Sequence, residues 1–153
     1  MLLFVGYGNP LRGDDGLGPA VVHQLAQRVQ RAGVQFVTCH QLTPELVETI
    51  SQSCHVVFID AFVGGCPGEI WCNSIEPSMS PGALNHYVSP AMLLAAARSW
   101  YGAKTTGTLI TISGASFGFS EQLSSPVEAA LRQVLEWLEQ GIDYYFRVYG
   151  LAA

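Results

Sequence analysis

The chain is poor in charged residues, which make up only 12% of its 153 residues. It has seven lysines and arginines against twelve aspartates and glutamates, a formal net charge of −5, and no basic cluster. Because nucleic acids and anionic membrane surfaces are bound through clustered positive charge, we expect neither as a partner. Hydrophobic residues make up 49% of the chain, which is typical of a well-packed globular protein.

Long apolar runs are also absent, and no stretch approaches the roughly 20 apolar residues of a membrane span. The N-terminal run from Leu2 to Val5 is too short for a signal peptide and lacks a basic flank. We therefore expect a cytoplasmic protein. Its length fits a single domain over residues 1–153, large enough to bury a sizeable core.

Several familiar catalytic and metal-binding motifs are missing. The four cysteines show no C-x-x-C spacing, so we expect reduced, mostly buried thiols and no zinc cluster. No G-x-S-x-G elbow signals a serine nucleophile, and no H-E-x-x-H signals a standard zinc protease. The cysteines are Cys39, Cys54, Cys66 and Cys72.

Short apolar runs alternate with helical patterns along the whole chain. This alternation predicts a three-layer α/β/α sandwich around a mainly parallel sheet. The predicted strands are Leu2–Val5, Val34–Cys39, His55–Ala61, Glu69–Ile75 and Thr106–Ser113. The predicted helices begin near Leu17, at Thr43-Pro44, at Ser89-Pro90 and at Ser125-Pro126, where the last three carry a capping residue followed by proline.

The first eighteen residues, MLLFVGYGNPLRGDDGLG, combine a buried strand, a glycine-rich turn and two adjacent acids. The turn fits neither the dinucleotide fingerprint nor the phosphate loop, in which Asp14 would replace the lysine and repel a phosphate. Either Asp14 or Asp15 could simply cap the following helix. Two successive acids at a strand end favour a cation site instead.

Asp60 and His86 are the other candidates for this site. Asp60 ends the most apolar predicted strand, and the carboxyl ends of parallel strands open onto one edge of the sheet, so Asp15 and Asp60 can converge. His86 precedes a helix in a loop rich in proline and serine, where a histidine can also be a surface residue. Weaker candidates are His23, His40 and His55. Two carboxylates and one imidazole suit zinc, nickel or manganese, and leave the open position that metal-assisted hydrolysis requires.

The segment from Gly6 to Gly18, G-x-G-N-x-L-x-x-D-D-G-x-G, resembles the signature of hydrogenase maturation proteases. The strand ending at Asp60, the histidine before a helix and the closing Leu123–Glu128 segment extend this resemblance over nearly the whole chain. It implies a five-stranded α/β/α sandwich and an endopeptidase that removes the C-terminal extension of a [NiFe]-hydrogenase large-subunit precursor. Asp15, Asp60 and His86 match the positions of the family's metal-binding and catalytic residues.

The resemblance also implies how the substrate is checked. Nickel already placed in the precursor would be bound by Asp15, Asp60 and His86, although other divalent ions can occupy such a site. The free enzyme would hold no tightly bound metal. Two alternatives remain open: a non-catalytic metal-binding assembly factor that docks on a hydrogenase subunit, and a generic peptide hydrolase with its own metal.

Overall fold

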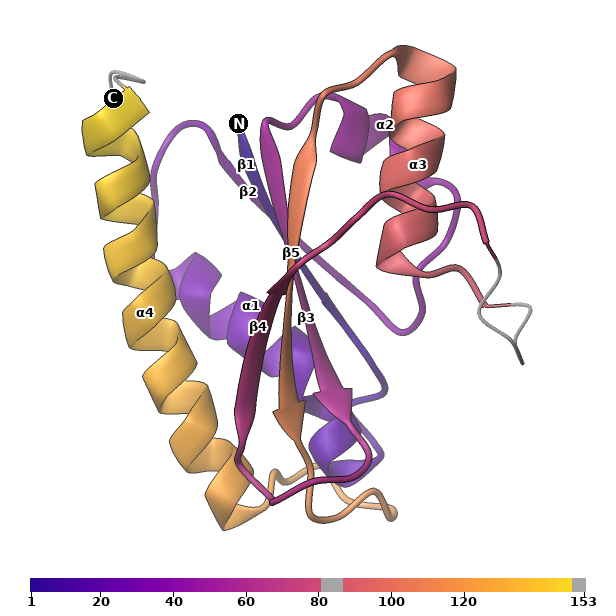
Figure 1. Ribbon diagram of the computed structural model, residues 1–153. Coiled ribbons are helices and arrows are strands. Elements are labelled where there is room, and N and C mark those ends of the chain that lie inside the picture. The colour runs from indigo at the N-terminus through magenta and orange to yellow at the C-terminus, as the bar shows by residue number, and fades with distance from the viewer. Residues whose placement is uncertain (81–86, 150–153) are drawn as a thin grey trace.

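A computed structural model describes residues 1–80 and 87–149, in which strands and helices alternate (Figure 1). The strands are β1 (Leu2–Tyr7), β2 (Val34–Cys39), β3 (His55–Phe62), β4 (Ile70–Ser74) and β5 (Thr106–Ser113). The helices are the 3-10 helix η1 (Gly13–Gly16), α1 (Leu17–Arg28), α2 (Leu46–Ser51), α3 (Pro90–Tyr101) and α4 (Ser125–Tyr149). Within these ranges no helix is long and apolar enough to cross a membrane.

The five strands form one sheet in the order β2-β1-β3-β5-β4. The first four in this order are parallel, and β4 runs antiparallel to β5 at the edge. Helices α1 and α4 cover one face of the sheet, and α2 and α3 cover the other (Figure 1). The predicted α/β/α sandwich around a mainly parallel sheet is therefore confirmed.

Two hydrophobic layers hold the helices to the sheet, and strand residues alternate between them. On β3, Val57 and Ile59 belong to the layer under α1 and α4, whereas Val56 and Phe58 belong to the layer under α2 and α3. All four side chains are at most 9% exposed. β3 is the middle strand of the sheet and is buried on both faces, as its continuous apolar run predicts.

The strand order places a topological switch point between β1 and β3. From β1 the chain continues into α1 on one face, whereas from β3 it continues through the edge strand β4 into α3 on the opposite face. At such a point the loops at the carboxyl ends of adjacent strands diverge and leave a crevice in which ligands bind. The helix η1 lies beside these carboxyl ends (Figure 1).

Helix α1 approaches the sheet so closely that its first turn has no room for a side chain. A Cβ atom on Gly18 would lie 2.3 Å from the carbonyl oxygen of Ile59 in β3 and 2.7 Å from that of Tyr7 in β1. Both neighbours are backbone atoms, which cannot move aside without distorting the sheet. The last glycine of the N-terminal motif therefore serves helix–sheet packing directly next to the switch point.

Two predicted helices differ from the observed ones. Helix α2 begins at Leu46 and not at Thr43, because Thr43 and Pro44 form a turn whose carbonyls accept hydrogen bonds from Leu46 and Val47. The glycine at position 141 predicts that the last helix gives way to a tail there, but helix α4 continues to Tyr149.

The expectation of mostly buried thiols is wrong. Cys54, Cys66 and Cys72 are exposed and Cys39 is partly buried, and all four are free. Cys66 lies in the loop after β3, and Cys72 lies on β4, the edge strand of the sheet that the described residues form. Position at the margin of the sheet overrides the usual preference of cysteine for the core.

Candidate functional site at the switch point

Asp15 is held at the carboxyl end of β1 by the glycine-rich turn. Its Oδ2 accepts a 2.7 Å hydrogen bond from the backbone N–H of Asn9. Gly8 has a φ of 140°, and a Cβ atom there would lie 1.9 Å from the carbonyl oxygen of Asp15. Only glycine allows the turn to wrap this tightly around η1. The motif thus fixes the position of the Asp15 carboxylate.

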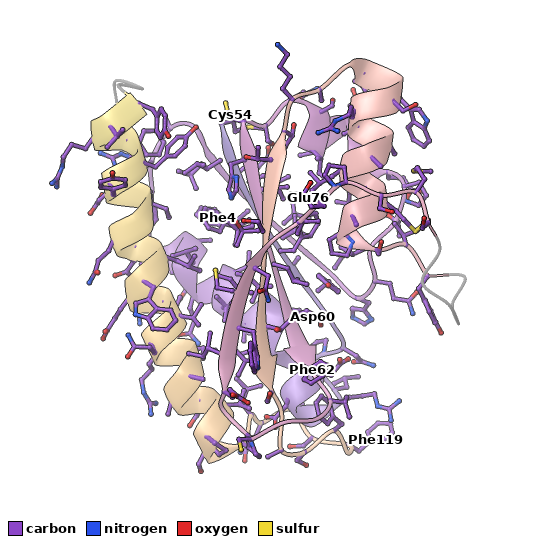
Figure 2. All side chains as sticks on the ribbon, in the orientation of Figure 1. Phe4, Cys54, Asp60, Phe62, Glu76 and Phe119 are labelled. Carbon is purple, nitrogen blue, oxygen red and sulfur yellow. The ribbon has the colours of Figure 1, made fainter. Side chains whose placement is uncertain are left out.

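Asp60 lies within β3 and not at its end, which corrects the prediction. The strand continues to Phe62, because pairing with β5 extends to Phe62 opposite Ser113. The backbone N–H of Ala61 donates to Oδ1 of Asp60 at 2.8 Å. Figure 2 shows Asp60 on the lower part of the sheet, with Phe62 further along the strand. The carboxylate therefore stands on a sheet face and not on a loop.

The two carboxylates interact. Burial raises the pKa of Asp60 to about 6, and the charge of Asp15 raises it as well, against the lowering effect of hydrogen bonds from Tyr7 and Ala61. Burial, followed by the charge of Asp60, also raises the pKa of Tyr7, so its hydroxyl stays protonated and can donate to the carboxylate. Asp15 and Asp60 thus form a pair of acids in a partly desolvated place, an arrangement that a divalent cation would relieve.

The third predicted ligand, His86, lies outside the described residues. Among residues 1–80 and 87–149, no three His, Cys, Asp or Glu side chains lie close enough to hold a metal ion. Helix α3, which follows His86 in the chain, covers the sheet face on which Tyr7 packs. The binding of a metal by Asp15, Asp60 and His86 stays a prediction.

Asp14 has a role that the sequence did not reveal. Its side chain is fully buried and accepts hydrogen bonds from the backbone N–H groups of Ala115, Ser116 and Ser124, and from the Ser124 hydroxyl, at 2.7–2.9 Å. Burial acts to raise its pKa, but these four bonds outweigh it and lower the pKa. Asp14 therefore anchors the loop between β5 and α4 to η1.

Neither acid caps helix α1. The residue before the helix is Gly16, and no side chain accepts a hydrogen bond from the first turn. The capping alternative is therefore wrong for both Asp14 and Asp15. The local sequence could not separate their roles, because the partners of Asp14 lie about a hundred residues further along the chain.

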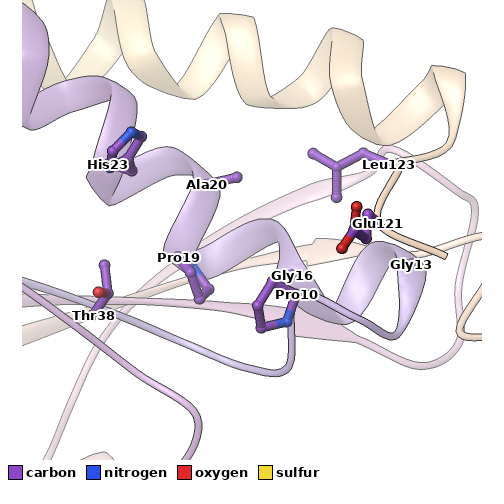
Figure 3. Close-up of a pocket in the computed structure, with 9 residues that line it drawn as sticks. All are labelled: Pro10, Gly13, Gly16, Pro19, Ala20, His23, Thr38, Glu121 and Leu123. Atoms are coloured by element: carbon purple, nitrogen blue, oxygen red, sulfur yellow. The ribbon is translucent and has the colours of Figure 1, made fainter. Parts of the chain in front are cut away.

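The weaker histidine candidates lie in three different places, and of these His40 directly follows Cys39, which pairs with Tyr7 of β1. The ring nitrogens of His55 lie 2.6 and 3.1 Å from the hydroxyls of Thr106 and Thr108, at the opposite end of β3. His40 is exposed after β2. His23 lies on α1 and lines a pocket of about 350 Å³ between the start of α1 and Glu121 (Figure 3). Neither Asp15 nor Asp60 lines that pocket.

The raised pKa of Asp60 predicts a pH-dependent stability. The folded state binds a proton at Asp60 up to about pH 6 and the unfolded state only up to about 3.8, so Asp60 destabilises the fold as pH rises between these values. The stability of Asp60→Asn relative to wild type should therefore be unchanged near pH 4. Above pH 7 the free energy of unfolding of Asp60→Asn should exceed that of wild type by a constant value of about 2 kcal/mol.

Urea denaturation of both proteins at pH 4.5, 6 and 8 measures this difference. The same series on Asp143→Asn, an exposed acid of α4, is the control and should show no comparable rise. A difference between Asp60→Asn and wild type that does not change with pH would contradict the raised pKa.

The fold is shared with solved structures of hydrogenase maturation proteases. A [NiFe] hydrogenase maturation protease HycI from Thermococcus kodakarensis is 23% identical, with a TM-score of 0.76 over 91% of this chain and 90% of that one. The maturating endopeptidase HybD from E. coli is 24% identical, with a TM-score of 0.74 over 94% and 93% of the two chains. A hydrogenase 2 maturation peptidase from a Thaumarchaeota archaeon is 26% identical, with a TM-score of 0.67 over 92% and 97%.

These likenesses confirm the resemblance that the N-terminal motif indicated, at the level of the fold. No family model matches the sequence, and no curated protein matches it significantly. The fold and the acid pair are therefore the two observations that indicate a function.

Proposed function

We propose that this chain is an endopeptidase of hydrogenase maturation, which removes the C-terminal extension of a nickel-loaded [NiFe]-hydrogenase large-subunit precursor. One observation carries the proposal. The neighbouring carboxylates of Asp15 and Asp60 stand at the switch point of a fold that solved hydrogenase maturation proteases share over about nine-tenths of the chain. A switch point is where α/β sheets bind their ligands.

Nickel belongs to the substrate in this proposal. Carboxylate oxygens and an imidazole nitrogen are acceptable ligands for this ion, and we assign them to Asp15, Asp60 and His86. Contact with the nickel would place the scissile bond beside the acid pair, and the metal can polarise its carbonyl or activate a water. Any other divalent ion with similar ligand preference would compete for the same carboxylates.

The residues around the acids support this role. The N–H of Asn9 donates to one oxygen of Asp15, and the N–H of Ala61 donates to one oxygen of Asp60. These bonds orient both carboxylates before the substrate binds. The hydrogen bond from the Tyr7 hydroxyl favours the charged form of Asp60 and lowers its pKa. Because Asp60 takes up a proton near pH 6, metal contact should strengthen as pH rises through that value.

We expect cleavage to require nickel in the precursor. Purified enzyme incubated with nickel-loaded precursor should release a C-terminal fragment, which mass spectrometry detects, and nickel-free precursor should stay intact. The reason is that the two carboxylates and the histidine of the enzyme position the scissile bond of the precursor only through the ion that both proteins bind. Adding a chelator before the nickel-loaded precursor should slow the release.

The outcome also separates the two alternatives. Stable binding of the precursor without any fragment would favour the assembly factor and contradict the proposal. Cleavage of unrelated peptides after addition of zinc would favour a generic hydrolase. Equal cleavage of loaded and empty precursor would keep the endopeptidase but remove nickel from substrate recognition.

A further inference from the structure

Asp60 belongs to a row of side chains that crosses the sheet at one level. Asp60 of β3 pairs with Thr111 of β5, and Thr111 pairs with Trp71 of β4. All three side chains lie on the face of α2 and α3, because their chain neighbours Ile70 and Ile112 pack into the layer under α1 and α4. Trp71 is therefore two strands away from the acid pair, on the same face.

This part of the sheet face is incompletely covered. Trp71 is 50% exposed, and Thr111 and Asp60 are only partly buried. Helix α3 packs nearer the other end of β5, where Leu94 lies against Gly107. Figure 1 shows α3 beside that end of the sheet, away from η1. A large aromatic side chain is thus left half in solvent, two strands away from Asp60.

The position of Trp71 at the margin adds to its accessibility. β4 is the last strand of the sheet and has a neighbour only on the β5 side among the described residues. Half-exposed tryptophans in such places are a preferred anchor of protein–protein contacts, since the ring offers a large apolar area at low cost in side-chain entropy. Trp71, Thr111 and Asp60 therefore form one row across three strands on the same face of the sheet, with Trp71 at its margin.

We infer that Trp71 is a specificity-determining residue, which packs on an apolar side chain of the protein substrate near the scissile bond. This inference rests on the proposed function. Two strand spacings of about 4.8 Å separate Trp71 from Asp60, a span of roughly 10 Å. An extended peptide advances about 3.3 Å per residue, so the contacted side chain lies about three residues from the cleaved bond.

The test uses Trp71→Ala with a matched control on the opposite face. Trp137 of α4 is 49% exposed, nearly the same as Trp71, but α4 covers the other side of the sheet. With nickel-loaded precursor, Trp71→Ala should raise KM by roughly tenfold or more and leave kcat within about twofold. Trp71→Phe should recover most of the affinity, and Trp137→Ala should match wild type.

A binding measurement separates this inference from the proposed function. In the Asp15→Ala background, where no cleavage is expected, the Kd for the precursor is measured with and without Trp71→Ala. A weaker Kd supports the inference, and an unchanged Kd overturns it even if wild type cleaves normally. Failure of wild type to cleave would overturn the proposed function alone. Should Trp71→Ala fold poorly, Trp71→Gln carries the same expectation.

The alternative partner for Trp71 is a second copy of the chain. Size-exclusion chromatography over a range of concentrations decides this, because substrate contact predicts the same elution for wild type and Trp71→Ala. A dimer that Trp71→Ala dissociates would assign the tryptophan to self-association and overturn the inference.

Discussion

Asp15→Ala is expected to abolish processing of the nickel-loaded precursor, with a rate at least about a hundredfold below wild type. The substitution removes one of two charged ligands proposed for the substrate's nickel. It should leave the fold intact, because the Asp15 side chain accepts one hydrogen bond from the protein backbone, that of Asn9. Loss of that bond costs about 1–2 kcal/mol, a shift in Tm of about 2–8 °C.

Mass spectrometry of the precursor and thermal melting of the enzyme measure the two effects. Asp143→Ala is the matched control, since Asp143 is an exposed acid of α4 paired with Arg31, and it should process normally. Full activity of Asp15→Ala would exclude Asp15 from the mechanism. A collapse in stability would show that its role is structural.

Asp14→Ala is expected to have the opposite effect and to destabilise the fold strongly. It leaves three backbone N–H groups and one hydroxyl without their acceptor in a buried place. Each such donor costs about 1–3 kcal/mol, and removing a buried charged partner typically costs about 3–5 kcal/mol in all. For a chain of this length the Tm should fall by about 10 °C.

Thermal melting at pH 7 and at pH 3 tests this. Because the pKa of Asp14 is lowered in the fold, its contribution is present above about pH 4 and is lost as the solution becomes more acidic. The difference between wild type and Asp14→Ala should therefore shrink at pH 3. A variant that melts within 2 °C of wild type at pH 7, a threshold of about half a kcal/mol, would contradict the anchoring role.

Local sequence patterns predicted most elements well. The bounds of β2 and β5 match the predicted strands, since each apolar run is limited by polar or glycine residues. Helix α3 begins where Ser89-Pro90 predicts, and Ser89 Oγ accepts a hydrogen bond from the Met92 N–H at 3.2 Å. Elements with strong start signals and continuous burial are the ones that the chain encodes locally.

The length of α4 shows where local signals mislead. Gly141 and the aromatic residues after it suggested that the helix had ended. Ile142 and Phe146 are nevertheless buried one turn apart and continue the apolar face under the sheet. The Arg31 guanidinium lies 4.6 Å from the centre of the Phe146 ring, which further secures the last turns. Tertiary packing outweighs the low helix propensity of one glycine.

The site was predictable only in part. The glycine-rich turn and the apolar run of β3 pointed to Asp15 and Asp60, and the fold brings these two acids close enough to interact. The role of Asp14 depends on a loop about a hundred residues away, and the row to Trp71 depends on the register of β4. Neither contact leaves a mark in the nearby sequence.

The pairing of Asp60 with Thr111 limits where residues can be inserted into or deleted from the chain. Side chains alternate between the faces of a strand, so inserting one residue into β3 before Asp60 would turn its carboxylate into the apolar layer under α1 and α4. The same insertion in β5 would bring an isoleucine to the position of Thr111. Insertions and deletions in homologues should therefore fall in the connections and never inside these two strands.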